Sequence, residues 1–140
     1  MKWQARSEAV CQAIRGRVAN ARVTAVGTGT PAELGRALEG RALVIAAGAA
    51  GVVLLPNTAR SAAQALKVAI DLNAVPPLGI EGIEMGDKGK ERDGIVGYGA
   101  IGVGDTKMKI HKAAISKLFE RNDQVLDAEE VYAIATGCVG

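Results

Sequence analysis

The chain has 140 residues, of which 49% are apolar and 3% aromatic, so it can build one domain with a sizeable core of small and branched side chains. Its formal net charge of +2 indicates no nucleic-acid partner by itself, and no apolar run reaches membrane-spanning length. The two cysteines, Cys11 and Cys138, form no disulfide framework, and a single histidine leaves no spacing for metal ligands. With a polar N-terminus and no signal peptide, we expect a cytoplasmic protein with reduced thiols.

The first half of the sequence predicts two helices, each followed by a strand. An amphipathic helix is expected over residues 2–19, and a short strand over Arg22–Val26. The stretch TPAELGRALEG begins with a threonine cap, a proline at the first helical position and a glutamate at the third, and a glycine stops it. Ala42–Ala46 is the strongest strand, a continuous apolar run typical of burial on both faces. The apolar face of the first helix comprises Trp3, Val10, Ile14 and Val18.

The second half continues the alternation. The next strand is expected at Lys67–Ile70, and the polar, glycine-rich stretch Gly82–Gly94 is expected to be a loop. Ile95–Gly104 reads as a fourth strand, followed by a helix over Asp105–Arg121 with its aspartate as cap. The stretch VLDAEEVYAIA carries a capping box and predicts a last helix.

Alternating strands and helices predict an α/β fold, with a parallel sheet of about four strands flanked by helices. Ligands of such sheets bind at the carboxyl ends of the strands. Two stiff loops are expected there: AAGAAG after the second strand and DLNAVPPLG after the third.

These two loops each allow two interpretations. The glycine of AAGAAG lets a ligand approach closely, but a tight turn without a ligand explains it slightly better. In DLNAVPPLG the prolines make an extended, rigid segment that could hold Asp71 and Asn73 against a planar ligand, or could simply cross the sheet edge. In the stretch VGTGTPAELG the third glycine is misplaced for a dinucleotide-binding loop and no acid follows at the expected distance, so a plain loop before a helix is preferred.

The stretch DTKMKIHK places Lys107 and His111 four residues apart, on one helix face. A lysine near a helix start opposes the helix dipole, which makes Lys107 a candidate for function. A solvated basic helix face is the simpler explanation.

Three stretches, VIAAGAAGVVLLP, DLNAVPPLGIEGIEMGDKGKE and GAIGVGDTKMKIHKAAISKLFE, resemble the C-terminal, Rossmann-type portion of NADP-dependent methylene-tetrahydromethanopterin dehydrogenases. The resemblance covers essentially the whole chain. It implies an oxidoreductase of one-carbon metabolism, in which a hydride passes from a methylene-pterin to NADP. It also implies that Lys107 faces the active-site cleft and that Lys2, with Arg6, matches the basic stretch that holds the cofactor's 2′-phosphate. The loop residues that would line the cofactor are Ala47, Gly48, Ala49, Asp71, Asn73 and Pro76.

The family's N-terminal domain, first two strands and glycine loop have no counterpart in these 140 residues, so the expected domain is a truncated Rossmann-like unit. One hypothesis is therefore a truncated homologue or split subunit, inactive alone and weak in binding NADP, which a complementing N-terminal subunit completes. The alternative is a stand-alone small-ligand-binding or assembly module without hydride chemistry. A sheet with helices on one face would expose apolar residues on the other, which favours a homo-oligomer, most simply a dimer. No nucleic acid or membrane partner is expected.

Overall fold

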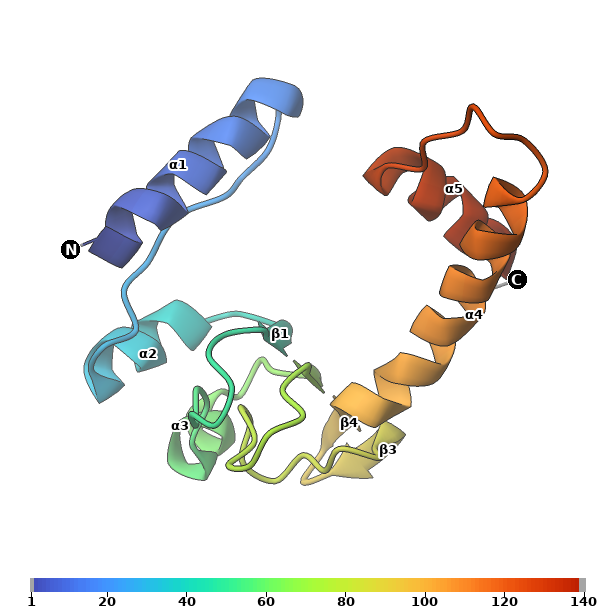
Figure 1. Cartoon of the computed structure of the whole chain (residues 1–140). Coiled ribbons are helices and arrows are strands. Elements are labelled where there is room, and N and C mark those ends of the chain that lie inside the picture. The colour runs from blue at the N-terminus through green and yellow to red at the C-terminus, as the bar shows by residue number, and fades with distance from the viewer. Residues whose placement is uncertain (1, 139–140) are drawn as a thin grey trace.

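The computed structural model describes residues 2–138 and confirms an α/β fold (Figure 1). One mixed sheet has the strand order β1-β2-β4-β3, in which β1, β2 and β4 run parallel and β3 pairs antiparallel with β4. No helix in this range is long and apolar enough to cross a membrane. The elements are α1 (Lys2–Arg17), α2 (Pro31–Leu38), β1 (Leu43–Ala46), α3 (Asn57–Ala62), β2 (Val68–Asp71), β3 (Lys88–Arg92), β4 (Ile95–Tyr98), α4 (Ala100–Leu118) and α5 (Ala128–Cys138).

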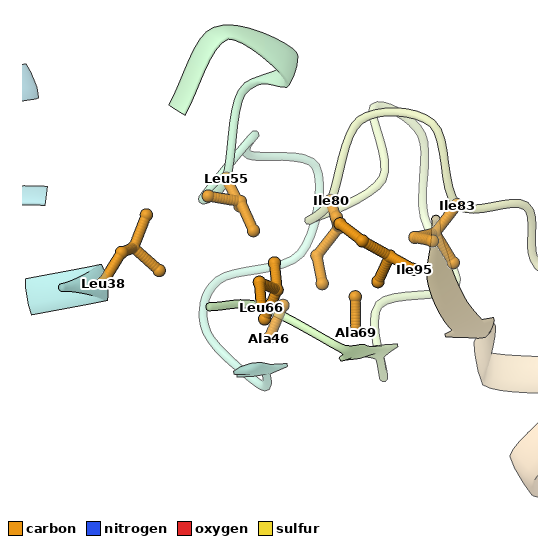
Figure 2. Close-up of a cluster of buried hydrophobic side chains, with 8 residues drawn as sticks. All are labelled: Leu38, Ala46, Leu55, Leu66, Ala69, Ile80, Ile83 and Ile95. Carbon is orange, nitrogen blue, oxygen red and sulfur yellow. The ribbon is translucent and has the colours of Figure 1, made fainter. Parts of the chain in front are cut away.

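The hydrophobic core lies on one face of the sheet (Figure 2). In the parallel register Ala46 and Ala69 point to this face, where Leu38 at the end of α2 and the segments after β1 and β2 cover them. Small side chains on the strands let the covering segments approach closely. The cluster comprises Leu38, Ala46, Leu55, Leu66, Ala69, Ile80, Ile83 and Ile95.

The opposite face of the sheet is open over β1. Leu43 and Ile45 are 50% and 53% exposed, although their strand neighbours Val44 and Ala46 turn toward the core. The expectation that this apolar run is buried on both faces is therefore wrong. We call the apolar side chains of this face the open face; they are Leu43, Ile45, Val68, Ile70, Val96 and Tyr98.

The strand expected at Arg22–Val26 is absent; the segment is extended but joins no sheet. Its recorded anchor is a hydrogen bond of 2.6 Å from Arg15 Nη2 to the Val23 carbonyl oxygen. An extended stretch becomes a strand only when a neighbouring strand pairs with its backbone, and local sequence does not reveal that neighbour. The helix before it forms but ends at Arg17, and the predicted apolar residues Val10, Ile14 and Val18 are exposed. The side chain of Trp3 lies outside the described residues.

The loop expected at Gly82–Gly94 contains β3, which forms a hairpin with β4. Asp93 and Gly94 connect the two strands, and both have positive φ angles, 50° and 76°. Positive φ at two consecutive turn residues is the requirement of the tight hairpin turn that Asp-Gly favours. The strand was not predicted because its sequence, KGKER, is charged and has no apolar residue that would indicate a buried face.

The boundary between the fourth expected strand and the next helix is also corrected. β4 ends at Tyr98 and α4 begins at Ala100, so Asp105 does not cap the helix. Its carboxylate instead pairs with Lys88 Nζ at 3.0 Å. Of the glycines that suggested a longer strand, Gly99 caps the helix and Gly102 lies in its first turn, where close packing leaves no room for a side chain.

Two predicted helix starts are confirmed. Thr30 and Glu33 form the capping box of α2, with hydrogen bonds of 3.2 Å and 3.0 Å between each side chain and the other residue's amide. Asp127 accepts from the amide of Glu129 at 2.8 Å, and Glu130 Oε2 accepts from the amide of Asp127 at 3.1 Å. Both motifs satisfy amides that a helix start otherwise leaves unpaired.

Candidate functional site

The candidate site lies where the parallel strands β1, β2 and β4 end at one edge of the sheet. The segments that follow β1 and β2 are joined by their backbones there. The amides of Leu54 and Leu55 both donate to the Gly79 carbonyl oxygen, at 2.8 and 2.9 Å, and Leu55 forms a parallel bridge with Ile80. The two loops that the sequence singled out therefore form one unit.

The tips of these loops lie side by side. Gly51 ends the AAGAAG turn with a positive φ of 71°, and a Cβ built on it would lie 3.7 Å from the Pro76 carbonyl oxygen and 4.0 Å from a methyl group of Val75. Glycine is required here because other residues rarely adopt that φ. The Pro76–Pro77 peptide bond is cis.

Asp71 is the last residue of β2, and its side chain is 1% exposed. Oδ1 accepts a hydrogen bond from the Asn73 amide at 3.0 Å, and Oδ2 accepts one from the Ile80 amide at 2.8 Å. A buried carboxylate with two amide donors is well satisfied. It closes the loop that carries the two prolines.

Asn73 contributes the unexplained polar group of this edge. Its side chain is 7% exposed, and Nδ2 has no hydrogen-bond partner among the described residues. It lies against Gly79, where a Cβ would come within 2.3 Å of Nδ2 and 2.9 Å of Asp71 Oδ1. A buried donor without an acceptor costs about 1–3 kcal/mol, so the amide is a candidate donor to a ligand oxygen.

The start of α4, at the end of β4, is closed by the chain itself. The amides of Ile101 and Gly102 donate to the Met85 carbonyl oxygen at 2.8 and 3.2 Å, and that of Gly99 donates to the Asp87 carbonyl oxygen at 2.9 Å. A Cβ on Gly102 would lie 1.8 Å from the same Asp87 oxygen. These amides are therefore not free to hold a phosphate group, which is how a helix start usually binds one.

An ion pair fixes the segment that supplies those carbonyl groups. Asp87 is 3% exposed and accepts from both Arg92 Nη2, at 2.8 Å, and Arg92 Nε. Its Oδ2 also accepts from the Glu84 amide at 2.8 Å. The hydrogen bonds from Arg92 lower the pKa of Asp87 despite its burial, and the same contact raises the pKa of Arg92.

Three further helix starts use side chains of the same chain. Thr30 caps α2, Glu81 Oε2 accepts from the first amide of α3 at 2.7 Å, and Asp127 caps α5. Within residues 2–138, no recorded helix start from α2 to α5 presents a free, glycine-lined cradle for a pyrophosphate.

The other predicted site residues are placed less closely. Ala47, Gly48 and Ala49 lie exposed in the turn after β1, and Gly48 packs on the Leu54 side chain. Lys107 lies exposed about two turns into α4, so it does not oppose the dipole at the helix start. No recorded hydrogen bond or ion pair within residues 2–138 joins its side chain to the strand-end loops. The side chain of Lys2 is outside the described residues.

Comparison with known proteins identifies two relatives from one organism. The chain is 46% identical over 113 residues to the bifunctional protein MdtA of Methylorubrum extorquens, a match that covers 81% of the chain and 39% of the relative. The NAD(P)-dependent methylenetetrahydromethanopterin dehydrogenase of the same organism is 35% identical over 101 residues, 70% of the chain and 34% of the relative. The chain is therefore homologous to a methylenetetrahydromethanopterin dehydrogenase. The chain thus spans less than half the length of either relative, and no family model matches it.

The sequence analysis missed several residues that shape this edge of the sheet. Gly79 and Gly102 permit backbone contacts closer than any side chain would allow, and Asp87 with Arg92 orients the carbonyl groups at the start of α4. The Asp-Gly turn signal at residues 93–94 could have indicated the hairpin of β3 and β4, and Arg92 is the last residue of β3. The close backbone contacts have no local signal.

Proposed function

We propose that this chain supplies the nicotinamide side of the cofactor site of an NAD(P)-dependent methylene-tetrahydromethanopterin dehydrogenase. The observation that carries the proposal is the buried, unpartnered Asn73 amide at the carboxyl end of the central strands, together with the homology. The edge is where ligands of parallel sheets bind. A bound nicotinamide would accept a hydride from the methylene carbon of a pterin.

The residues present fit the nicotinamide end of such a cofactor. Asn73 Nδ2 needs an acceptor, and the carboxamide oxygen of a nicotinamide is one. The hydrogen bond from the Asn73 amide to Asp71 fixes the backbone of Asn73. Gly51 lets the backbone of the first loop lie close to Pro76 in the second loop. In this proposal Ala47, Ala49 and Pro76 form the wall against the ribose, and Lys107 orients the pterin.

The same residues do not fit the pyrophosphate. The helix starts from α2 to α5 have amides already bonded within the chain, so additional polypeptide must hold the phosphates. A complementing N-terminal subunit would supply that element. If none exists, the alternative of a small-ligand-binding or assembly module without hydride chemistry follows, and the closed start of α4 favours it for the chain alone.

Titration of the chain with NADP, with and without tetrahydromethanopterin, tests this division. The chain alone should bind NADP weakly or not at all, and adding the N-terminal part of the MdtA relative should restore binding. In the complemented protein, Asn73→Ala should weaken NADP binding by about five- to tenfold, the value of one neutral hydrogen bond. Tight binding by the chain alone would refute the division of labour.

Hydride transfer in the complemented protein then tests Lys107. Lys107→Ala should abolish single-turnover reduction of NADP while the melting temperature stays unchanged. Lys109→Ala is the matched control, because it removes the same charge from the same helix two residues away. Equal activity of the two variants would show that Lys107 has no special role and is one of several lysines on a solvated helix face.

A further inference from the structure

A cavity of about 740 Å³ lies between α1, the extended segment 22–27 and α2. Its volume is within the range of roughly 300–1,000 Å³ of small-molecule sites. Figure 1 shows this segment running back beside α1 before it turns into α2. Arg15 holds the wall in place, because its guanidinium donates to the Val23 carbonyl oxygen and pairs with Glu8 at 3.1 Å.

Three arginines, Arg22, Arg36 and Arg41, line this cavity. No hydrogen bond or ion pair is recorded for their guanidinium groups anywhere in residues 2–138. Of the other six arginines in that range, Arg6 and Arg17 also lack a carboxylate partner, whereas four have one: Arg15, Arg60, Arg92 and Arg121. All three side chains are exposed, and unpaired guanidinium groups around one concavity favour the entry of an anion.

Glu33 is the acidic residue among the described residues that line the cavity, and its carboxylate already accepts a hydrogen bond. Its Oε2 accepts from the Thr30 amide at 3.0 Å as part of the α2 capping box. A carboxylate committed to a helix start neutralises the three arginines only in part. The cavity therefore keeps a positive potential.

The remaining wall is apolar. Cys11, 8% exposed, lies in it with Ile14 and Val26. Guanidinium groups bind phosphate oxygens in a bidentate way, and the apolar wall suits a ring or chain attached to the phosphate. We propose that this cavity binds the phosphate monoester of a small organic molecule.

This site is separate from the strand-end loops and does not depend on the proposed function. Arg41 comes two residues before β1, so it lies at the amino end of that strand, whereas the candidate cofactor site lies at the carboxyl end. The phosphate ligand is thus held at the opposite edge of the sheet.

Calorimetric titration of the full chain with AMP tests the proposal, with inorganic phosphate as the probe without an organic part. AMP should bind more tightly than inorganic phosphate, and the double variant Arg36→Gln/Arg41→Gln should lose about tenfold or more in AMP affinity. Arg17→Gln is the control, because Arg17 is an exposed arginine of α1 outside the recorded lining. Absence of AMP binding at millimolar concentration, or an equal loss in the control, overturns the site; equal affinity for inorganic phosphate overturns the ligand class.

The reactivity of the Cys11 thiol provides a second test of whether AMP binds in this cavity. In a Cys138→Ser background, bound AMP should slow the reaction of Cys11 with a thiol reagent several-fold, because the thiol lies in the cavity wall. Melting temperatures of the arginine variants, measured alongside, verify that they fold. Unchanged thiol reactivity at saturating AMP would place the ligand elsewhere and overturn the assignment.

Discussion

Asp71 Oδ2 accepts a hydrogen bond from the amide of Ile80, nine residues further along the chain, at 2.8 Å. With the Asn73 amide on the other oxygen, this one side chain closes the loop that holds both prolines. We propose that this loop is part of the cofactor site. Because both oxygens of the Asp71 carboxylate accept hydrogen bonds from backbone amides of the loop, its observed role is to hold the loop in shape.

Asp71→Asn should therefore lower the free energy of unfolding by about 2 kcal/mol, because its new NH₂ group opposes a backbone amide that also donates. Urea unfolding measures the difference. Asp105→Asn is the control, since Asp105 is exposed and its pair with Lys88 is worth about 0–1 kcal/mol. An equal, small effect of both substitutions would show that the loop closes without the carboxylate.

The pair of Asp87 and Arg92 should make stability depend on pH. The pKa of Asp87 is lowered from its ordinary value of 3.8 by the hydrogen bonds from Arg92. The stabilisation is thus complete above about pH 4 and disappears as the pH falls through the lower pKa of the folded state. Asp87→Asn should cost about 3 kcal/mol at pH 7, where Arg92 loses its partner, and progressively less in acid. Unfolding measured from pH 7 to pH 2.5 would reveal a pH-independent difference if the pair contributes nothing.

Gly102→Ala should strongly destabilise the start of α4. Its Cβ would lie 1.8 Å from the Asp87 carbonyl oxygen, so either the helix or residues 85–88 must move. We expect a loss of about 3 kcal/mol. Gly104→Ala, in the same helix with no atom within 4 Å of its Cβ, should instead stabilise by up to about 1 kcal/mol. Thermal unfolding of both variants measures the two changes in stability. If both substitutions changed the stability in the same direction, the close packing at Gly102 would be contradicted.

Two chains should associate through the open face, since Leu43 and Ile45 are half exposed on it. Sedimentation equilibrium should detect a dimer at micromolar concentration. Ile45→Lys should convert it to a monomer, because a charge would be buried in the interface. Phe119→Lys, at an 87% exposed position outside the sheet, should leave the dimer intact. A monomeric parent chain would refute the dimer.

Three features of the fold could be predicted from the sequence. They are the alternation of helices and strands, the capping boxes at Thr30 and Asp127, and the meeting of two loops at one edge of the sheet. These features depend on local patterns of side chains. The absent strand at residues 22–26 and the true start of α4 could not be predicted, because they depend on which backbone lies nearby. The cofactor-binding role of Asn73 and the catalytic role of Lys107 remain predictions, whereas the buried state of Asp71 and Asn73 is a property that only the folded chain reveals.

The two margins of the sheet differ in how they would meet another polypeptide. β3, at one margin, carries the sequence KGKER and a register shift between Lys88 and Lys90, which discourage a further strand from adding to it. β1, at the other, has the sequence LVIA, without a charge, proline or irregularity. Foreign extended segments would add to this margin first, so solubility at high concentration should depend on how well β1 is shielded. Handling of this protein in solution should thus depend on the four apolar residues of this margin.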